Sequence, residues 1–141
     1  MLLVDANVLL HAENSATREH ERAREWLIEA LDGGEAVAFT WLVLLAFLRL
    51  ATSRAIFPRP LAPETAIGVL EAWLAAPAAV IVEPTRQHLS LLGGLLARAG
   101  TAGNLVNDAH LAAIALEHDA TVVSFDRDFG RFEGVRSQVP G

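Results

Sequence analysis

The sequence predicts a helix-rich α/β fold with three layers, in which helices cover both faces of a short parallel sheet. Two observations lead to this prediction. Short runs of three or four residues alternate along the chain with longer segments that have helical periodicity. Each short run is almost entirely apolar, as strands are when helices cover both of their faces. Because the chain shows no linker and no internal repeat, residues 1–141 are expected to form one domain.

Four strands and six helices are expected in alternation. The predicted strands are residues 2–4, 36–39, 80–82 and 121–123. The predicted helices are residues 7–13, a segment that begins after Ser15 or Thr17 and ends at Asp32, then 41–52, 63–76, 86–99 and 105–117. The predicted N-caps are Ser15 or Thr17, Thr40, Thr85 and Asn104. Pro63 suits the first turn of its helix, and Gly100 is expected to end the helix before it.

The residue types that are missing narrow the chemistry. The chain has no Cys, no Lys and no Tyr, and all eleven of its basic residues are Arg. Without Cys there is no disulfide, thiolate metal site or cysteine nucleophile. Without Lys there is no Walker-type phosphate loop and no Schiff-base chemistry. If the protein is an enzyme, carboxylates are therefore the expected catalytic groups.

The net charge of −6 argues against a nucleic-acid-binding surface that covers the whole protein, because phosphate contacts need a basic field. A local basic patch remains compatible with this charge. Residues 42–62 contain no acid but three arginines, Arg49, Arg54 and Arg59, which are candidates for phosphate contact. A role of Arg49 in stabilising the C-terminus of its helix is an equally simple interpretation.

The N-terminus shows neither a basic region nor a long apolar run, so no signal peptide is predicted. The longest apolar stretch, residues 39–48, is shorter than the roughly 20 residues that span a bilayer. A soluble, cytoplasmic protein is expected.

Acidic residues follow two of the predicted strands. Asp5 comes directly after the first strand, Asp126 and Asp128 follow the fourth, and Asp108 lies in the first turn of the predicted helix 105–117. Ligands of open parallel sheets bind beyond the carboxyl ends of the strands, and carboxylate oxygens suit Mg²⁺ or Mn²⁺. Taken singly, Asp108 also fits a role in stabilising a helix N-terminus, and Asp126 and Asp128 fit a turn.

Three motifs and one further segment stand in a characteristic order. The motifs are VDANVLL at residues 4–10, NDAHLA at residues 107–112 and VSFDRDF at residues 123–129. The segment WLVLLAFLR occupies residues 41–49. In sequence, order and spacing these resemble the PIN domains, and more narrowly the VapC-type ribonuclease toxins of bacterial toxin–antitoxin modules. The resemblance extends over essentially the whole chain.

The resemblance implies a PIN-like α/β/α sandwich that binds Mg²⁺ or Mn²⁺ through clustered carboxylates and cuts single-stranded or looped RNA by metal-assisted hydrolysis. It also implies a cognate antitoxin that lies in the toxin groove. The implied residues are Asp5, Asp108 and Asp126 as catalytic metal-binding acids, Asp128 as an accessory acid, and Asn7, Asn107 and Ser124 as polar residues that orient the carboxylates or a water. Arg49, Arg54 and Arg59 then become candidates for RNA contact.

One position departs from the family pattern. Many relatives have a Glu directly before the Phe of the second motif, where this chain has Ala46. Alanine cannot ligate a metal ion, so three hypotheses stay open: catalysis with the remaining acids, reduced metal affinity, or a non-catalytic module that binds RNA or an antitoxin. Glu13 is the nearest upstream acid, and a solvated helix residue is its simpler interpretation. A phosphotransfer domain with Asp5 as nucleophile is disfavoured, because such domains normally need a Lys.

The remaining residues point to packing and partners. Residues 41–48 have no polar face, and residues 89–96 are similarly rich in Leu, so these helices are expected to be buried or to line an interface. A homodimer is therefore expected. The histidines show no metal-binding pattern, since His110 and His118 are eight residues apart on one predicted helix. No histidine is assigned to a metal.

Overall fold

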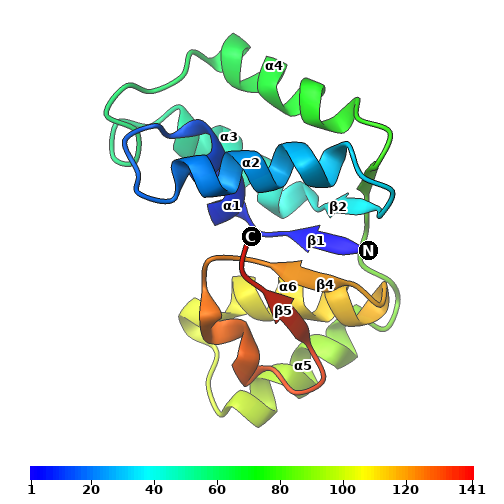
Figure 1. Cartoon of the computed structure of the whole chain (residues 1–141). Coiled ribbons are helices and arrows are strands. Elements are labelled where there is room, and N and C mark those ends of the chain that lie inside the picture. Colours follow the sequence, from blue (N-terminus) through cyan, green and yellow to red (C-terminus); the bar gives the residue numbers. More distant parts are fainter.

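The computed structural model describes residues 1–141 and contains one five-stranded sheet in which every strand pair is parallel. The strands are β1 (Leu2–Val4), β2 (Val37–Phe39), β3 (Ala79–Ile81), β4 (Thr121–Val123) and β5 (Arg136–Gln138), and their order across the sheet is β3-β2-β1-β4-β5 (Figure 1). The first strand in the sequence therefore lies at the centre, between β2 and β4. The predicted α/β class is confirmed, with one strand more than the sequence predicted.

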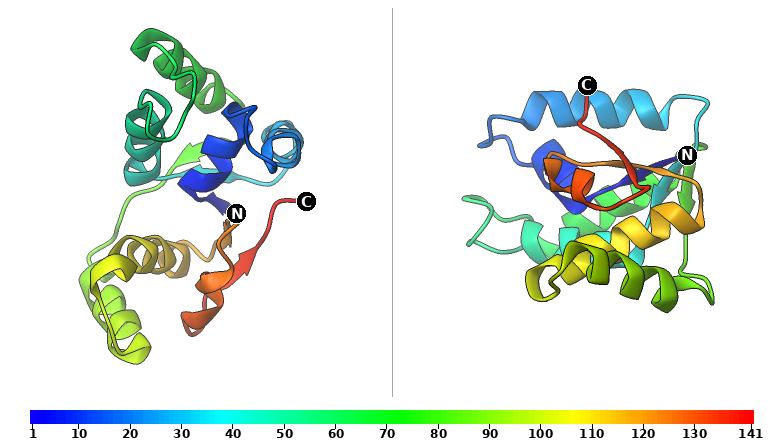
Figure 2. Two further views of the ribbon diagram at one scale, coloured as in Figure 1. Left: turned by 90° about the vertical axis from the view of Figure 1, so that its left-hand side faces the viewer. Right: turned by 90° about the horizontal axis from the view of Figure 1, so that it is seen from below.

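Six helices and two short 3₁₀ helices connect the strands. The helices are α1 (Ala6–Glu13), α2 (His20–Leu31), α3 (Trp41–Ala51), α4 (Pro63–Leu74), α5 (His88–Ala99) and α6 (Val106–Glu117), and the 3₁₀ helices are η1 (Gly103–Leu105) and η2 (Arg127–Arg131). Figure 2 shows α1 and α2 on one side of the strands and α5 and α6 on the other, which is the expected three-layer arrangement. None of the helices combines the length and apolar character that a membrane span requires.

The central strands form the core and the edge strands do not. Nearly all side chains of β1, β2 and β4 are buried, and the core contains three fully buried phenylalanines, Phe39, Phe47 and Phe129. The edge strand β5 is exposed at all three residues, Arg136, Ser137 and Gln138. Because neither face of β5 carries an apolar side chain, no hydrophobic pattern indicated it. Only its backbone hydrogen bonds to the β4 segment make it a strand.

Three of the predicted helix boundaries are confirmed by their capping contacts. Thr40 precedes α3 and its Oγ1 accepts a hydrogen bond from the Val43 N–H at 3.3 Å. Pro63 is the first residue of α4, where its missing N–H costs nothing. Gly100 ends α5 in the left-handed conformation, with φ of +75°, which glycine adopts without steric cost.

The other predicted N-caps are wrong, because local turns satisfy the side chains before each helix begins. Ahead of α2, the Thr17 hydroxyl donates to the Asn14 carbonyl, Ser15 makes no cap, and the helix begins only after Glu19. Ahead of α5, Thr85 accepts from the Gln87 N–H, and Gln87 is the residue that precedes the helix. Asn104 lies within η1, whose tighter turn leads directly into α6.

Candidate active site

The parallel pairing of β1 with β4 brings the first acid next to the last motif. Val4 lies beside Val123 in the sheet register, so Asp5 and Ser124 emerge side by side although 119 positions separate them in the sequence. The backbone supports this junction, since the Asp5 N–H donates to the Val123 carbonyl at 3.0 Å. The carboxyl ends of two adjacent central strands thus form the base of the site, as expected for an open parallel sheet.

The Asp5 carboxylate is held by three hydrogen bonds. Its Oδ1 accepts from the Ala6 N–H at 2.7 Å and so caps α1. Its Oδ2 accepts from the Ser124 hydroxyl at 2.7 Å and from the Asn7 amide at 3.2 Å. Burial raises the pKa of Asp5, and the hydrogen bonds from Ser124 and Ala6 oppose that rise by stabilising the ionised form. The side chain is therefore oriented before any ligand binds.

Ser124 is the centre of this network. It is 1% exposed, and its Oγ accepts from the Asn7 amide and from the Asp126 N–H, both at 2.9 Å. The Asn7 Oδ1 in turn accepts from the Phe125 N–H at 3.1 Å. Asn7 and Ser124 therefore tie the start of α1 to the segment after β4, and this couples the positions of Asp5 and Asp126.

Asp126 and Asp128 form a separate turn beyond β4. The Asp126 Oδ1 accepts from the Asp128 N–H at 2.8 Å and caps η2, which leaves its other oxygen without a protein donor. The Asp128 carboxylate lies 3.7 Å from the Arg131 guanidinium and is mostly exposed. Asp126 can therefore both stabilise the turn and bind a ligand, because one of its oxygens suffices for the turn.

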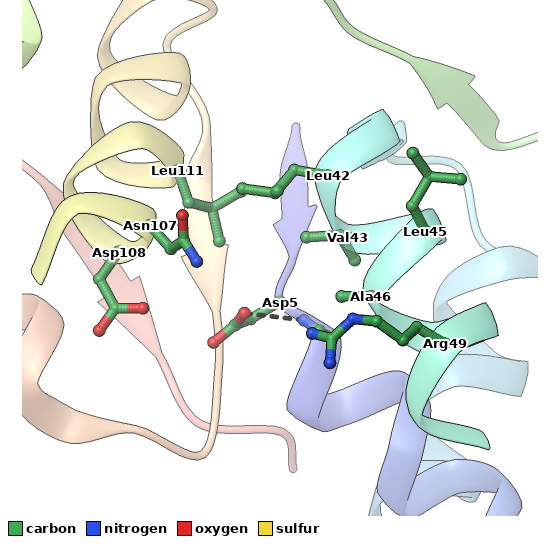
Figure 3. Close-up of a pocket in the computed structure, with 10 residues that line it drawn as sticks. Asp5, Leu42, Val43, Leu45, Ala46, Arg49, Asn107, Asp108 and Leu111 are labelled. Atoms are coloured by element: carbon green, nitrogen blue, oxygen red, sulfur yellow. Dashed lines mark hydrogen bonds between the residues drawn. The ribbon is translucent and has the colours of Figure 1, made fainter. Parts of the chain in front are cut away.

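Asp108, in the first turn of α6, lies on the wall of a cavity whose opposite wall is α3 (Figure 3). Burial and the negative charges of Asp5, Asp126 and Asp128 raise its pKa to about 6, against a smaller opposing effect of Arg131. The raised pKa thus has two causes: the Asp108 carboxyl group is partly removed from solvent, and three other acids lie near it. Two of the three predicted metal-binding acids, Asp5 and Asp108, line the same cavity.

The donors at this site suit a hard divalent cation, although they do not form a closed cage. No three Asp, Glu or His side chains approach one another closely enough to make a ready-formed metal cluster. Mg²⁺ commonly binds through one or two carboxylates and completes its coordination shell with waters and substrate phosphate oxygens. An open arrangement of carboxylates, as at this site, is therefore compatible with Mg²⁺. Oxygen-only donors and the unbalanced charge around Asp108 both agree with such an ion.

The cavity itself has a volume of about 450 Å³ and lies between α6 and α3. Figure 3 shows Asn107, Asp108 and Leu111 of α6 on one side, α3 on the other and Asp5 between them. The lining residues are Asp5, Ala6, Leu42, Val43, Leu45, Ala46, Arg49, Asn107, Asp108 and Leu111. The Asn107 amide makes no hydrogen bond within the protein, so it does not orient a carboxylate here as Asn7 does.

Comparison with known proteins places the chain in a family. The family model for the PIN domain matches residues 2–135. The chain belongs to the PIN-domain family. It is 55% identical over 140 residues to ribonuclease VapC37 of Mycobacterium tuberculosis, covering 99% of this chain and 97% of the relative, which places it among the VapC proteins of that family.

Solved structures agree in fold at low sequence identity. VapC20 of Mycobacterium tuberculosis, described as a toxin that cleaves the sarcin–ricin loop, matches with a TM-score of 0.70 at 18% identity, over 96% of this chain and 99% of that one. VapBC2 of Rickettsia felis, solved with a DNA fragment from its promoter, matches with a TM-score of 0.69 at 19% identity, over 98% of this chain and 97% of that one. Both comparisons confirm the PIN-like α/β/α architecture.

The three arginines predicted for phosphate contact do not gather at one place in this PIN domain. Arg49 lines the cavity beside Asp5, whereas Arg59 lines a second cavity of about 260 Å³ together with Glu13. Arg54 is exposed and lines neither cavity. Glu13 therefore stands away from the site, so it does not replace the carboxylate that Ala46 lacks.

The sequence did not indicate a hydrogen-bonded network of polar side chains near the C-terminal end of α6. The His88 Nδ1 contacts the Glu117 Oε2 at 2.8 Å, and the His88 Nε2 contacts the His110 Nδ1 at 2.8 Å. Glu117 also accepts from the Thr85 N–H and hydroxyl at 2.9 and 2.6 Å. Because these residues lie on different segments, no spacing in the sequence could have indicated this network. No histidine joins a metal cluster.

The apolar wall of the cavity was predicted only in outline. The sequence indicated that residues 41–48 are buried or line an interface, and the structure divides them. Val43, Leu44 and Phe47 are buried in the core, whereas Trp41, Leu42 and Leu45 are 49%, 39% and 58% exposed. Helix α3 therefore presents an apolar strip beside the acids.

Proposed function

We propose that this PIN domain, residues 1–141, is a metal-dependent endoribonuclease and the toxin of a toxin–antitoxin module. The observation that carries the proposal is the surroundings of Asp108: burial, together with the negative charges of Asp5, Asp126 and Asp128, raises its pKa to about 6. Groups in a cavity with strongly perturbed pKa values are candidates for function. Membership of the VapC proteins supports ribonuclease chemistry at this place in the fold.

Asp5, Asp108 and Asp126 are the residues that would hold Mg²⁺ or Mn²⁺, with Asp128 as an accessory acid. When bound, such a cation withdraws charge from a phosphate oxygen and favours ionisation of a nearby water. Asn7 and Ser124 keep the Asp5 oxygens aimed at the cavity through the hydrogen bonds described above. Asn107 lines the cavity with a free amide and is available for a substrate or a water.

The reaction is hydrolysis of a phosphodiester bond of RNA. The water oxygen bonds to phosphorus while the bond from phosphorus to the 3′ oxygen breaks, and the departing 3′ oxygen takes up a proton from solvent. A carboxylate oxygen of the acidic group accepts the proton that the water loses. Because water and not the 2′-hydroxyl is the nucleophile, the products carry a 5′-phosphate and a 3′-hydroxyl. Arg49, Arg54 and Arg59 contribute contacts to RNA phosphates along the acid-free segment 42–62.

The same surfaces support the expected partners. The antitoxin follows from the family resemblance, and a solved neighbour is a VapBC assembly. The exposed strip Trp41, Leu42 and Leu45 is apolar surface that a partner would cover, either an antitoxin or a second copy in a homodimer. The protein is expected to act in the cytoplasm, where a bacterial toxin of this kind meets its RNA.

A second function, a PIN-fold module that binds RNA or an antitoxin without cutting, is favoured by one observation. Helix α3 supplies no acid to the cavity, because Ala46 lies where many relatives have Glu. The two functions separate in a cleavage assay on cellular RNA with Mg²⁺, Mn²⁺ or EDTA, followed by mapping of new 5′ ends. Discrete cleavage that needs the cation supports the ribonuclease, whereas binding without cleavage supports the second function.

The site assignment is tested with Asp5→Asn and Asp108→Asn in the same assay. Each change removes a negative charge from the cavity, so each is expected to reduce cleavage by about 10³-fold or more while the fold persists. Cation-dependent cleavage that survives both changes would refute the assignment. Circular dichroism of each variant checks that the loss comes from the site.

A further inference from the structure

The two walls of the cavity differ in charge. The two acids of the cavity, Asp5 and Asp108, come from the end of β1 and from the start of α6. The opposite wall is α3, which contributes Leu42, Leu45, Ala46 and Arg49 and no acid (Figure 3). Ala46 and Arg49 stand three residues apart on one helix and so share a face. The position that lacks a carboxylate is thus adjacent to the only basic residue of the cavity.

Arg49 has no partner within the protein. Its guanidinium takes part in no hydrogen bond and no ion pair, unlike Arg98, Arg131 and Arg136, which each contact an acid. The Arg49 charge is therefore not neutralised by an ion pair with an acid. The segment from residue 42 to residue 62 holds no acid that would compete with a ligand for it.

We propose that Arg49 binds a non-bridging oxygen of the scissile phosphate and supplies the positive charge that a second cation would supply, so that the site holds one divalent ion. The inference rests on the proposed ribonuclease function. A second ion near α3 would need ligands from that wall, and the wall offers only aliphatic side chains and a guanidinium. Guanidinium is permanently charged and its planar fork of N–H donors matches phosphate oxygens.

Metal binding provides a test that does not depend on activity. Titration with Mn²⁺, followed by electron paramagnetic resonance, is expected to show one tight ion per wild-type chain. Arg49→Gln is expected to keep this count, because Arg49 is not a ligand. Ala46→Glu is expected to add a second ion by placing a carboxylate on the α3 wall. Two tight ions in the wild type would overturn the proposal.

Kinetics test the role of the charge itself. Arg49→Gln is expected to lower kcat by about 10²-fold, the effect of losing one donor to a developing negative charge. Added guanidinium ion is expected to restore part of the activity of Arg49→Ala, which a merely structural role would not allow. The matched control is Arg86→Gln, an exposed arginine next to Thr85, which hydrogen-bonds to Glu117 at the opposite end of α6 from Asp108. This control is expected to leave cleavage unchanged.

The outcomes separate this inference from the proposed function. A wild-type protein that cleaves no RNA with either cation contradicts the ribonuclease itself. A wild-type protein that cleaves RNA while Arg49→Gln retains full kcat contradicts only the role of Arg49. The double variant with Ala46→Glu and Arg49→Gln sharpens the result, because a second ion is expected to recover activity that the single Arg49 change loses.

Discussion

The two ends of helix α6 carry carboxylates in opposite situations. Asp108 in its first turn has a pKa raised to about 6, because burial and three other acids disfavour its charge. Glu117 at its last residue has a lowered pKa despite burial, because Thr85 and His88 hydrogen-bond to its ionised form. One charge is left unbalanced beside a cavity and the other is fully paired between α5 and α6. This difference supports the proposal that Asp108 is a binding group and that Glu117 has a structural role.

Among changes to the groups that support the two carboxylates, the largest effect is expected at the network that orients Asp5. Ser124→Ala removes the donor to the Asp5 Oδ2 and the acceptor of the Asn7 amide and the Asp126 N–H. Loss of such a supporting contact typically costs 10–100-fold in metal affinity or activity, so we expect a decrease of that order in both. Cleavage rate and Mn²⁺ affinity are the measurements. Ser137→Ala, on exposed β5, is the control, and equal effects of the two changes would argue against an orienting role.

At the C-terminal end of α6, where Glu117 lies, the expected effect is on stability. Glu117→Gln removes the negative charge that accepts from Thr85 and His88, and hydrogen bonds to charged groups contribute roughly 1.5–3 kcal/mol. We expect the free energy of unfolding at pH 7 to fall by about 2 kcal/mol with little change in cleavage. Urea unfolding measures the change. Glu83→Gln, an exposed neighbour, is expected to be neutral.

The pH dependence of this difference follows from the lowered pKa of Glu117. The ionised group stabilises the fold at pH values above its ordinary pKa of 4.5, and this contribution is lost as pH falls through 4.5 and below. The gap in stability between the wild type and Glu117→Gln should therefore shrink in acid. A gap that stays constant from pH 7 to pH 3.5 would show that packing, and not charge, carries the effect.

The smallest effect is expected from Asp108 in the absence of metal. Because its folded-state pKa of about 6 exceeds the ordinary value of 3.8, its ionised form costs stability above pH 6, and the cost disappears as pH falls toward 3.8. Asp108→Asn should therefore raise stability at pH 7.5 in EDTA, by about 1 kcal/mol, a small value because the group is partly solvated. Thermal unfolding measures it. Equal melting temperatures of variant and wild type at pH 7.5 would contradict an unbalanced acidic site.

The elements of this fold that the sequence predicted are those whose local signals agree with their burial. Leu2–Val4 and Thr121–Val123 are apolar runs inside the sheet, and Thr40 and Gly100 cap their helices as such residues commonly do. The strand Arg136–Gln138 was missed, because an exposed edge strand is specified by backbone pairing and not by a hydrophobic pattern.

The sequence by itself determined which groups are available for chemistry. The chain has no Cys, Lys or Tyr, so its reactive side chains are mainly acids, arginines and hydroxyls. The position of Asp5 directly after an apolar strand indicated that it lies at the carboxyl ends of the strands, where open parallel sheets bind ligands. Only the tertiary structure decided which of these groups meet. The pairing of β1 with β4 sets Ser124 beside Asp5, and the packing of α3 against this edge puts Arg49 in the cavity while Arg54 and Arg59 stay outside it. Such contacts join segments more than 40 residues apart, and no local pattern of side chains encodes the distance between them.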